Sequence, residues 1–387
     1  MYVYLDYNAT TAPAPDVVEA VAAALRNLPG NASSVHRFGQ MAKAGLDTAR
    51  EQIAALIGAA PTEIVFTGSG TEADNLALRG AAEALEPTGR REVIVSAIEH
   101  EAVLNTARAL ERRGWTMTVL PVGDSGIVNP DDLRARISAN TAVVSVMHAN
   151  NEVGTVQPIA ELAGIARAEG ALFHTDAVQS VGKVAVNVAT LGADLVALSG
   201  HKFYGPKGTG ALWVRRGVRL VSQMTGGRQE RSRRAGTENV PGLVGLGVAA
   251  ARAAQSMGAE AVRLAALRDR LEMGILDSVS GTTVNGARDR RVPNTTNISF
   301  EYVEAESLLI ALDLEGIAVS TGSACSSGTL EPSHVLRAMG LGPSRTQSSL
   351  RFSLGASTTE SDVDRVIGVL PKLVAKLRSL TRVSARA

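Results

Sequence analysis

Short apolar runs rich in β-branched residues alternate with stretches of helical spacing as far as about residue 255. The runs that predict strands are residues 63–67, 92–97, 116–122, 141–149, 171–178, 193–200 and 208–214. Between these runs lie helical stretches such as residues 42–57, where Leu46, Ile53 and Ile57 fall on one face before Gly58. This alternation predicts an α/β fold with a mostly parallel, seven-stranded sheet covered by helices on both faces.

The pattern changes beyond about residue 255. Helical spacing recurs near residues 258–278, 304–315 and 359–379, and strand patterns occupy residues 295–302 and 348–354. We therefore expect a large α/β domain over residues 15–255. A smaller α+β domain is expected to combine residues 1–14 with residues 256–387.

Charge and hydropathy exclude several classes of partner. The chain has 39 basic and 38 acidic residues, so it carries no surplus charge for nucleic acid or an anionic membrane. It has no apolar run of about 18 residues, and its first residues lack the basic and apolar regions of a signal peptide. We expect a cytoplasmic protein that acts on small molecules or other proteins.

Cys325 is the only cysteine in the chain, and it lies in the small, polar stretch "STGSACSSG" at residues 320–328. One thiol forms no internal disulfide, and with six scattered histidines it is a poor start for a metal site. We expect no resident metal. The exception would be a transient contact between Cys325 and a metal cluster. The thiol is either an inert small core residue or a reagent, and its unpatterned polar surroundings favour the reagent.

Lys202 is one of only six lysines, and it directly follows an apolar strand in "DLVALSGHKFYG". At the carboxyl end of a parallel strand, an amine with a lowered pKa can form a Schiff base with a carbonyl group. Asp176 ends the preceding strand, where a carboxylate among apolar neighbours needs a positive partner such as a pyridinium nitrogen. The alternative for Lys202 is a strand-end lysine that reaches solvent.

A cradle for pyridoxal phosphate would complete this set, because that cofactor needs a lysine, an acid at its ring nitrogen and a phosphate site. The stretch "FTGSGTEADNLAL" at residues 66–78 predicts a strand, a glycine-rich turn and a helix. The free amides of that helix and the Thr71 hydroxyl could hold a phosphate dianion. Taken alone, such a turn before a helix is more often only a tight connection.

Other polar residues near strand ends extend this hypothesis. His100 could stack on a flat ring and move protons, or only begin a helix. Asn151 and Gln179 could hydrogen-bond a ring oxygen, although two adjacent asparagines are also ordinary turn residues. Thr237 lies in a second loop suited to anions. Arg351, within an apolar strand, could bind a substrate carboxylate bidentately or form a buried structural ion pair.

Together these segments resemble the cysteine desulfurases of the NifS/IscS group, a branch of the class V aminotransferase-like enzymes with the pyridoxal phosphate-dependent transferase fold of type I. The resemblance runs over nearly the whole chain. Its motifs are "YLDYNATT", "GNASSVHRFG", "TGSGTEADN", "IEHEAVL", "HANNEVGTVQPI", "HTDAVQSVGK", "SGHKFYGPKGTG", "GGRQERSRRAGTENV", "STGSACSSGTLEPSHVL" and "LRFSLG".

The resemblance implies a role for each candidate residue. Lys202 would bond to the cofactor, Asp176 would hold its ring nitrogen, and His100 would stack and act as acid and base. Asn151 and Gln179 would bind the ring oxygen. The residues implied for the phosphate are Gly70, Thr71, Ser199, His201 and, from the other subunit of a homodimer, Thr237. Asn8 and Arg351 would position the substrate carboxylate.

The resemblance also implies a reaction. L-cysteine would become L-alanine, and its sulfur would pass to Cys325, in a loop at about residues 321–334, as a persulfide. An acceptor protein for iron–sulfur cluster assembly or another thiolation would then receive it. The alternatives are a selenocysteine lyase or an aminotransferase on the same fold, or a non-catalytic scaffold.

Overall fold

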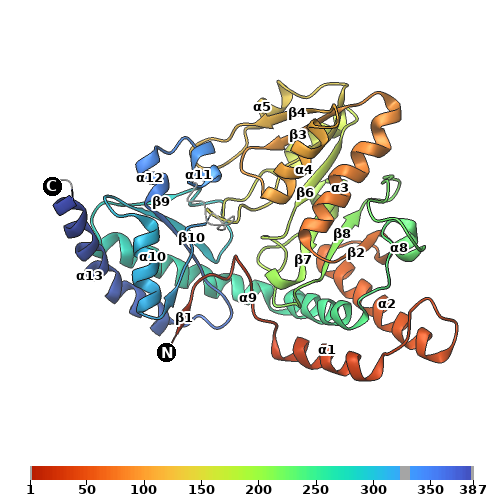
Figure 1. The fold of residues 1–387 in the computed structure, drawn as a ribbon, viewed down its shortest axis with the longest axis horizontal. Helices are drawn as coiled ribbons and strands as arrows, with labels where there is room; N and C mark the ends of the chain where they lie inside the picture. The colour runs from red at the N-terminus through yellow and green to blue at the C-terminus, as the bar shows by residue number, and fades with distance from the viewer. Residues whose placement is uncertain (1, 323–331, 385–387) are drawn as a thin grey trace.

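A seven-stranded sheet forms the centre of the computed structural model, which describes residues 2–322 and 332–384 (Figure 1). Its strands in chain order are β2 (Ile64–Thr67), β3 (Glu92–Ser96), β4 (Thr116–Leu120), β5 (Thr141–Ser145), β6 (Leu172–Asp176), β7 (Leu195–Ser199) and β8 (Gly210–Val214). Their order across the sheet is β2-β8-β7-β6-β5-β3-β4, and only β8 runs antiparallel to its neighbours. The predicted α/β fold with a mostly parallel sheet is confirmed.

Helices cover both faces of this sheet. On one face, α2 (Arg37–Ile57), α6 (Ile159–Ala168) and the start of α9 (Val240–Ser278) enclose a core that includes Phe66 and Val144. On the other face, α3 (Gly70–Leu85) and α4 (Glu101–Glu111) pack on the alternate positions Val65 and Val143. Adjacent strand residues therefore serve opposite cores, which explains why the strand sequences are apolar without interruption.

Helix α9 begins at Val240, well before the helical stretch expected near 258–278. Glycines in its first turns disguise the helical pattern, since glycine is a poor helix former. Packing explains them. A Cβ on Gly245 would lie 2.5 Å from Val21 of α1 (Pro15–Asn27), and one on Gly247 would lie 2.6 Å from the Cα of Ala49. The glycines thus let α9 approach α1 and α2 closely.

The second half of α9 enters a separate core, at the other end of the molecule (Figure 1). That core is built from an antiparallel sheet in the order β12-β10-β9, with two helices and a two-stranded parallel pair of β1 and β11. The bounds are β1 (Val3–Tyr4), β9 (Thr282–Asn285), β10 (Thr295–Phe300), α10 (Ala305–Leu314), β11 (Ile317–Ala318), β12 (Ser349–Ser353) and α13 (Glu360–Ser384). The two cores support the expected division near residue 255, which we retain as a proposal.

The remaining helices are short. They are η1 (Pro61–Glu63), η2 (Glu86–Thr88), α5 (Pro130–Arg134), α7 (Val188–Leu191), η3 (Gly200–Lys202), α8 (Gln229–Ser232), α11 (His334–Ala338) and α12 (Pro343–Gln347). Within the described ranges, no helix has the length and apolarity needed to cross a membrane.

Three consecutive residues within α8 have left-handed backbone angles: φ is 46° at Glu230, 56° at Arg231 and 62° at Ser232. Left-handed angles are unfavourable for residues with a side chain. The turn is held by Arg50, whose guanidinium donates two hydrogen bonds of 2.7 Å to the buried Glu230 carboxylate. Glu230 also accepts from the amide of Phe66, so the turn is fixed to the edge strand β2.

Candidate active site

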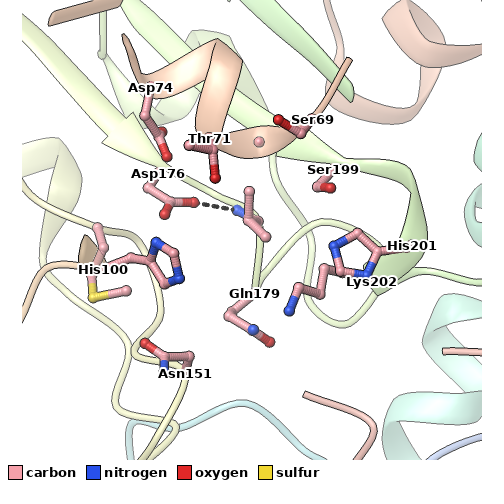
Figure 2. Close-up of a pocket in the computed structure, with 13 residues that line it drawn as sticks. Ser69, Thr71, Asp74, His100, Asn151, Asp176, Gln179, Ser199, His201 and Lys202 are labelled. Atoms are coloured by element: carbon pink, nitrogen blue, oxygen red, sulfur yellow. Dashed lines mark hydrogen bonds between the residues drawn. The ribbon is translucent and has the colours of Figure 1, made fainter. Parts of the chain in front are cut away.

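A cavity of about 210 Å³ lies where the parallel strands end at their carboxyl termini, beside the first turn of α3. Its lining residues come from segments far apart in the chain: Ser69, Gly70, Thr71, Asp74, His100, Met147, Asn151, Asp176, Val178, Gln179, Ser199, His201 and Lys202. Figure 2 shows most of these side chains pointing toward a common space. Every residue predicted to contact a cofactor lines this cavity, with the exception of Thr237.

The first turn of α3 forms one wall of the cavity. Ser69 caps the helix, because its hydroxyl accepts a hydrogen bond from the amide of Glu72 at 3.1 Å. A Cβ on Gly70 would lie 2.7 Å from Val178, so only glycine leaves this wall open. The first-turn amides lack acceptors within the helix and carry the positive end of its dipole. With the hydroxyls of Thr71 and Ser199, these amides could hold a phosphate.

Asp176 supplies a buried carboxylate at the end of β6. The amide of Val178 donates to its Oδ1 at 2.8 Å (Figure 2). Burial raises the pKa of Asp176, while the nearby His100 and Lys202 oppose that rise. A cationic ring nitrogen at this carboxylate would relieve the cost of its burial.

Asp74 lies on the same side of the cavity, and the sequence alone gave it no role. Burial and the charges of Asp176 and Glu99 raise the pKa of Asp74 well above its usual range. Its Oδ1 lies 3.5 Å from Nε2 of His174, and neither atom has a hydrogen-bond partner in the described part of the chain. The sequence did hold a signal for Asp74, because it lies one turn into the same helix as Thr71, the helix predicted to hold a phosphate.

Lys202 ends the short turn η3 directly after β7. Its Nζ donates hydrogen bonds to the backbone carbonyls of Asn8 at 2.7 Å and Ala9 at 2.8 Å. Burial, together with the charge of Arg351, lowers the pKa of Lys202 to about 8, while the charges of Asp176 and Asp6 act in the opposite direction. Near pH 7 a minority of this amine, on the order of a tenth, is therefore neutral and nucleophilic.

Arg351 reaches toward the site from β12, in the second core. Its Nη1 donates to the carbonyl of Asn151 at 2.9 Å, and its Nη2 lies 2.6 Å from Oδ1 of Asp6. Its buried Nε has no hydrogen-bond partner among the described residues. The Nε–H is thus among the guanidinium N–H groups left for a further acceptor.

Asn8 lies next to the cavity and is not part of its lining. Its side chain already makes four hydrogen bonds: it donates to Thr295 and to the carbonyl of Asn151, and accepts from Lys183 and Asn294. Its predicted contact with a substrate carboxylate would require one of these bonds to be exchanged. In this arrangement its backbone carbonyl, rather than its amide, meets Lys202.

Two predicted residues lie outside this assembly. Thr237 is exposed and lies on the segment between α8 and α9, so it does not line the cavity of its own chain. Cys325 falls outside the described residues.

These groups fit pyridoxal phosphate. A helix N-terminus with hydroxyls suits the phosphate, and a buried carboxylate that forms no ion pair with the described residues suits a protonated ring nitrogen. An amine of lowered pKa suits the carbonyl. All three lie around a single cavity, so the residues present can hold the cofactor together.

Comparisons with known proteins agree with this fit. Residues 3–366 match the family model of the class V aminotransferases. A protein named cysteine desulfurase from Nostoc sp. is 51% identical over 379 residues, which cover 98% of this chain and 94% of that protein. Cysteine desulfurase IscS from Dictyoglomus turgidum is 48% identical, with 98% and 96% covered.

Solved structures give the same answer. A NifS-like protein superposes with a TM-score of 0.89 at 35% identity, covering 98% of this chain and 99% of its own. SspA in complex with cysteine superposes with a TM-score of 0.80 at 35% identity, covering 91% of this chain and 98% of its own.

Fold and site together therefore define a pyridoxal phosphate-dependent enzyme of fold type I. The chain belongs to the class V aminotransferase family, and the expected resemblance to the NifS/IscS-like cysteine desulfurases is confirmed.

Proposed function

We propose that this chain is a cysteine desulfurase, which converts L-cysteine to L-alanine and transfers the sulfur to Cys325 as a persulfide. The observation that carries the proposal is the convergence of Lys202 and Asp176 on one cavity, with Arg351 beside it. This arrangement provides a base, a site for a cationic ring and a ligand for a substrate carboxylate.

The cofactor would be held by residues of several segments. We assign the phosphate to Gly70, Thr71, Ser199 and His201, the ring nitrogen to Asp176, the ring oxygen to Asn151 and Gln179, the ring face to His100 and the carbonyl carbon to Lys202. When bound, pyridoxal phosphate supplies a ring that takes up the electron pair left at the substrate α-carbon.

The chain's own residues would orient the substrate and move its protons. Arg351 would bind the carboxylate of L-cysteine, with its orphaned Nε–H as one donor. The neutral Lys202 amine would remove the α-proton, because burial holds its pKa at about 8, close to the working pH. His100, exposed at the mouth of the cavity, would exchange protons with the sulfur and the thiol.

Sulfur transfer would need a single displacement. The thiolate of Cys325 attacks the sulfur of L-cysteine, so that an S–S bond forms as the C–S bond breaks. The electron pair of the broken bond stays with the substrate carbon, which gains protons and leaves as L-alanine. The products balance as alanine and an enzyme persulfide.

A homodimer and an acceptor protein complete the proposal. Thr237 is exposed and does not line the cavity of its own chain, so we assign it to the phosphate site of a second copy. The persulfide would pass to a scaffold for iron–sulfur clusters or to another thiolation protein. We place these steps in the cytoplasm, where a lone thiol stays reduced.

The test compares wild type with Cys325→Ala and, as a control, Ser326→Ala, using L-cysteine and a reductant. We expect Cys325→Ala to keep the absorbance of the bound cofactor and to lose both alanine and sulfide production. The control should retain both activities. Undiminished alanine and sulfide production by Cys325→Ala would overturn the persulfide step and favour a lyase.

The dimer has a separate test. A sedimentation mass of one 40.2 kDa chain would contradict the assignment of Thr237. A mass of two chains would support it.

A further inference from the structure

Lys183 is a partly buried lysine next to the cavity, and neither the sequence nor the mechanism above assigns it a role. It lies four residues after Gln179, on a helix-like turn in which the amide of Lys183 donates to the carbonyl of Ser180. Its Nζ donates hydrogen bonds of 2.7 Å to Oε1 of Gln179 and 2.8 Å to Oδ1 of Asn8. Both acceptors are themselves almost fully buried.

These contacts decide which way the Gln179 amide points. A lysine amine donates hydrogen bonds, so it draws the oxygen of a neighbouring amide toward itself. The Gln179 Oε1 is thereby held by Lys183, and the Nε2 group faces away from it. One Nε2 hydrogen goes to the carbonyl of Asn8 at 3.0 Å. The other meets no acceptor among the described residues, and Gln179 lines the cavity.

Lys183 is also connected to Lys202 through Asn8. The carbonyl of Asn8 accepts from Lys202 Nζ at 2.7 Å and from Gln179 Nε2 at 3.0 Å. Lys183 holds the side chain of the same asparagine. The Lys183 amine therefore holds both Gln179, at the cavity wall, and Asn8, whose backbone carbonyl accepts a hydrogen bond from Lys202.

A lowered pKa of Lys183 does not remove these bonds. Burial lowers the pKa of Lys183 well below its usual range, and the charges of Lys202 and Arg351 lower it further. A neutral amine still has two N–H groups, which is the number of acceptors that it meets here. A neutral Lys183 thus donates to Gln179 and Asn8 without adding a third buried positive charge beside Lys202 and Arg351.

We propose that Lys183 is a positioning residue, which fixes the Gln179 amide with its N–H toward the cavity so that it can donate to the ring oxygen of the cofactor. The proposal rests on the assignment of pyridoxal phosphate to this cavity. A substitution that removes the amine would let the Gln179 amide rotate and present its oxygen, which repels an anionic ring oxygen.

The test measures cofactor binding, independently of turnover. Apoprotein of wild type, Lys183→Met and Lys43→Met is titrated with pyridoxal phosphate, and the absorbance of the bound cofactor is followed against pH. Lys43 is exposed and pairs with Asp47, so it controls for the loss of a lysine. We expect Lys183→Met to bind the cofactor about tenfold more weakly, since one hydrogen bond to a charged group is lost. The pH midpoint of its absorbance change should also shift.

A double-mutant cycle separates positioning from a general structural effect. If Lys183 acts through Gln179, the loss caused by Lys183→Met should largely disappear in a Gln179→Ala background. Equal losses in both backgrounds would overturn the proposal. The proposal would also be overturned if Lys183→Met bound pyridoxal phosphate with wild-type affinity and showed the wild-type pH midpoint.

A donor-retaining variant covers the case in which Lys183→Met fails to fold. Lys183→Arg keeps N–H donors at this position, and we expect its midpoint to lie closer to that of wild type than the midpoint of Gln179→Ala does. A Lys183→Arg midpoint equal to that of Gln179→Ala would contradict the proposal. If wild type itself binds no pyridoxal phosphate, the proposed function fails, which is a different result from either of these.

Discussion

Nη2 of Arg351 lies 2.6 Å from Oδ1 of Asp6, although 345 positions separate the two residues in the chain. This pair joins β12 to the segment that follows β1, and it directs the guanidinium toward the carbonyl of Asn151. A carboxylate of the protein therefore already holds one side of the group that we assign to the substrate carboxylate. The buried Nε–H has no hydrogen-bond partner among the described residues, so it is one donor that a substrate carboxylate could use.

Arg351→Lys should raise the KM for L-cysteine by about tenfold or more, because an ammonium group cannot bind Asp6 and a substrate carboxylate with a planar fork. The absorbance of the bound cofactor should not change. Steady-state kinetics against L-cysteine measures this, with Arg345→Lys as a control, since Arg345 binds Asn285 in the small sheet. An unchanged KM would remove Arg351 from the substrate site.

Lys202→Ala should lower kcat by roughly 10³-fold, which is typical of the loss of a positioned general base. The other residues of the cavity should still bind pyridoxal phosphate, so absorbance of bound cofactor should persist in an altered form. Alanine production gives the rate, and Lys207→Ala, at an exposed lysine, is the matched control. A near-normal rate in Lys202→Ala would show that another group takes the proton.

Glu99→Gln should stabilise the protein at high pH. Burial raises the pKa of Glu99 from 4.5 to about 8, against hydrogen bonds from Ser96 and the amide of Met147. A raised pKa in the folded state means that the stabilisation is complete below pH 4.5 and is lost as the pH rises through 8. A glutamine keeps the hydrogen bonds and never ionises.

Melting temperatures at pH 5 and pH 8.5 measure this difference. The variant should gain on the order of a few degrees over wild type at pH 8.5 and much less at pH 5. Glu111→Gln, at an exposed position on α4, should show no such pH dependence. A gain of equal size at both pH values would exclude ionisation of Glu99 as the cause.

Ser232→Gly should raise stability by about 0.5–1 kcal/mol, since φ of 62° costs a serine more than a glycine. The opposite change, a loss of about 0.5 kcal/mol, is expected for Ser256→Gly within α9, because glycine is a poorer helix former than serine. Denaturant unfolding of both variants gives the two signs. A loss of stability in Ser232→Gly would mean that the left-handed turn is not under strain.

Much of the fold could be predicted because each central strand is a short apolar run between polar loops. The predicted strands extended too far mainly at their carboxyl ends. Residues such as Met147 and Ala177 are apolar and buried, yet they belong to the loops that surround the cavity. Hydrophobicity reports burial and does not distinguish a strand from a buried loop.

The candidate residues could be placed at strand ends from sequence, but their partners could not. The contacts of Arg351 with Asp6, of Lys202 with the Asn8 carbonyl and of Lys183 with Asn8 join distant segments. No local pattern encodes such pairs. The sequence therefore indicated which chemical groups are present, while the fold shows how they hold one another.

Helix α9 has a mechanical consequence. It contributes Ala253 to one core and Leu264 to the other, and no residue between them is buried. This exposed span is about 16 Å long at 1.5 Å per residue. It contains Gly258, around which a Cβ would meet nothing within 4 Å. Any change in the angle between the two cores would bend the helix here, and the span would act as a flexural hinge that sets how closely Arg351 can approach Lys202.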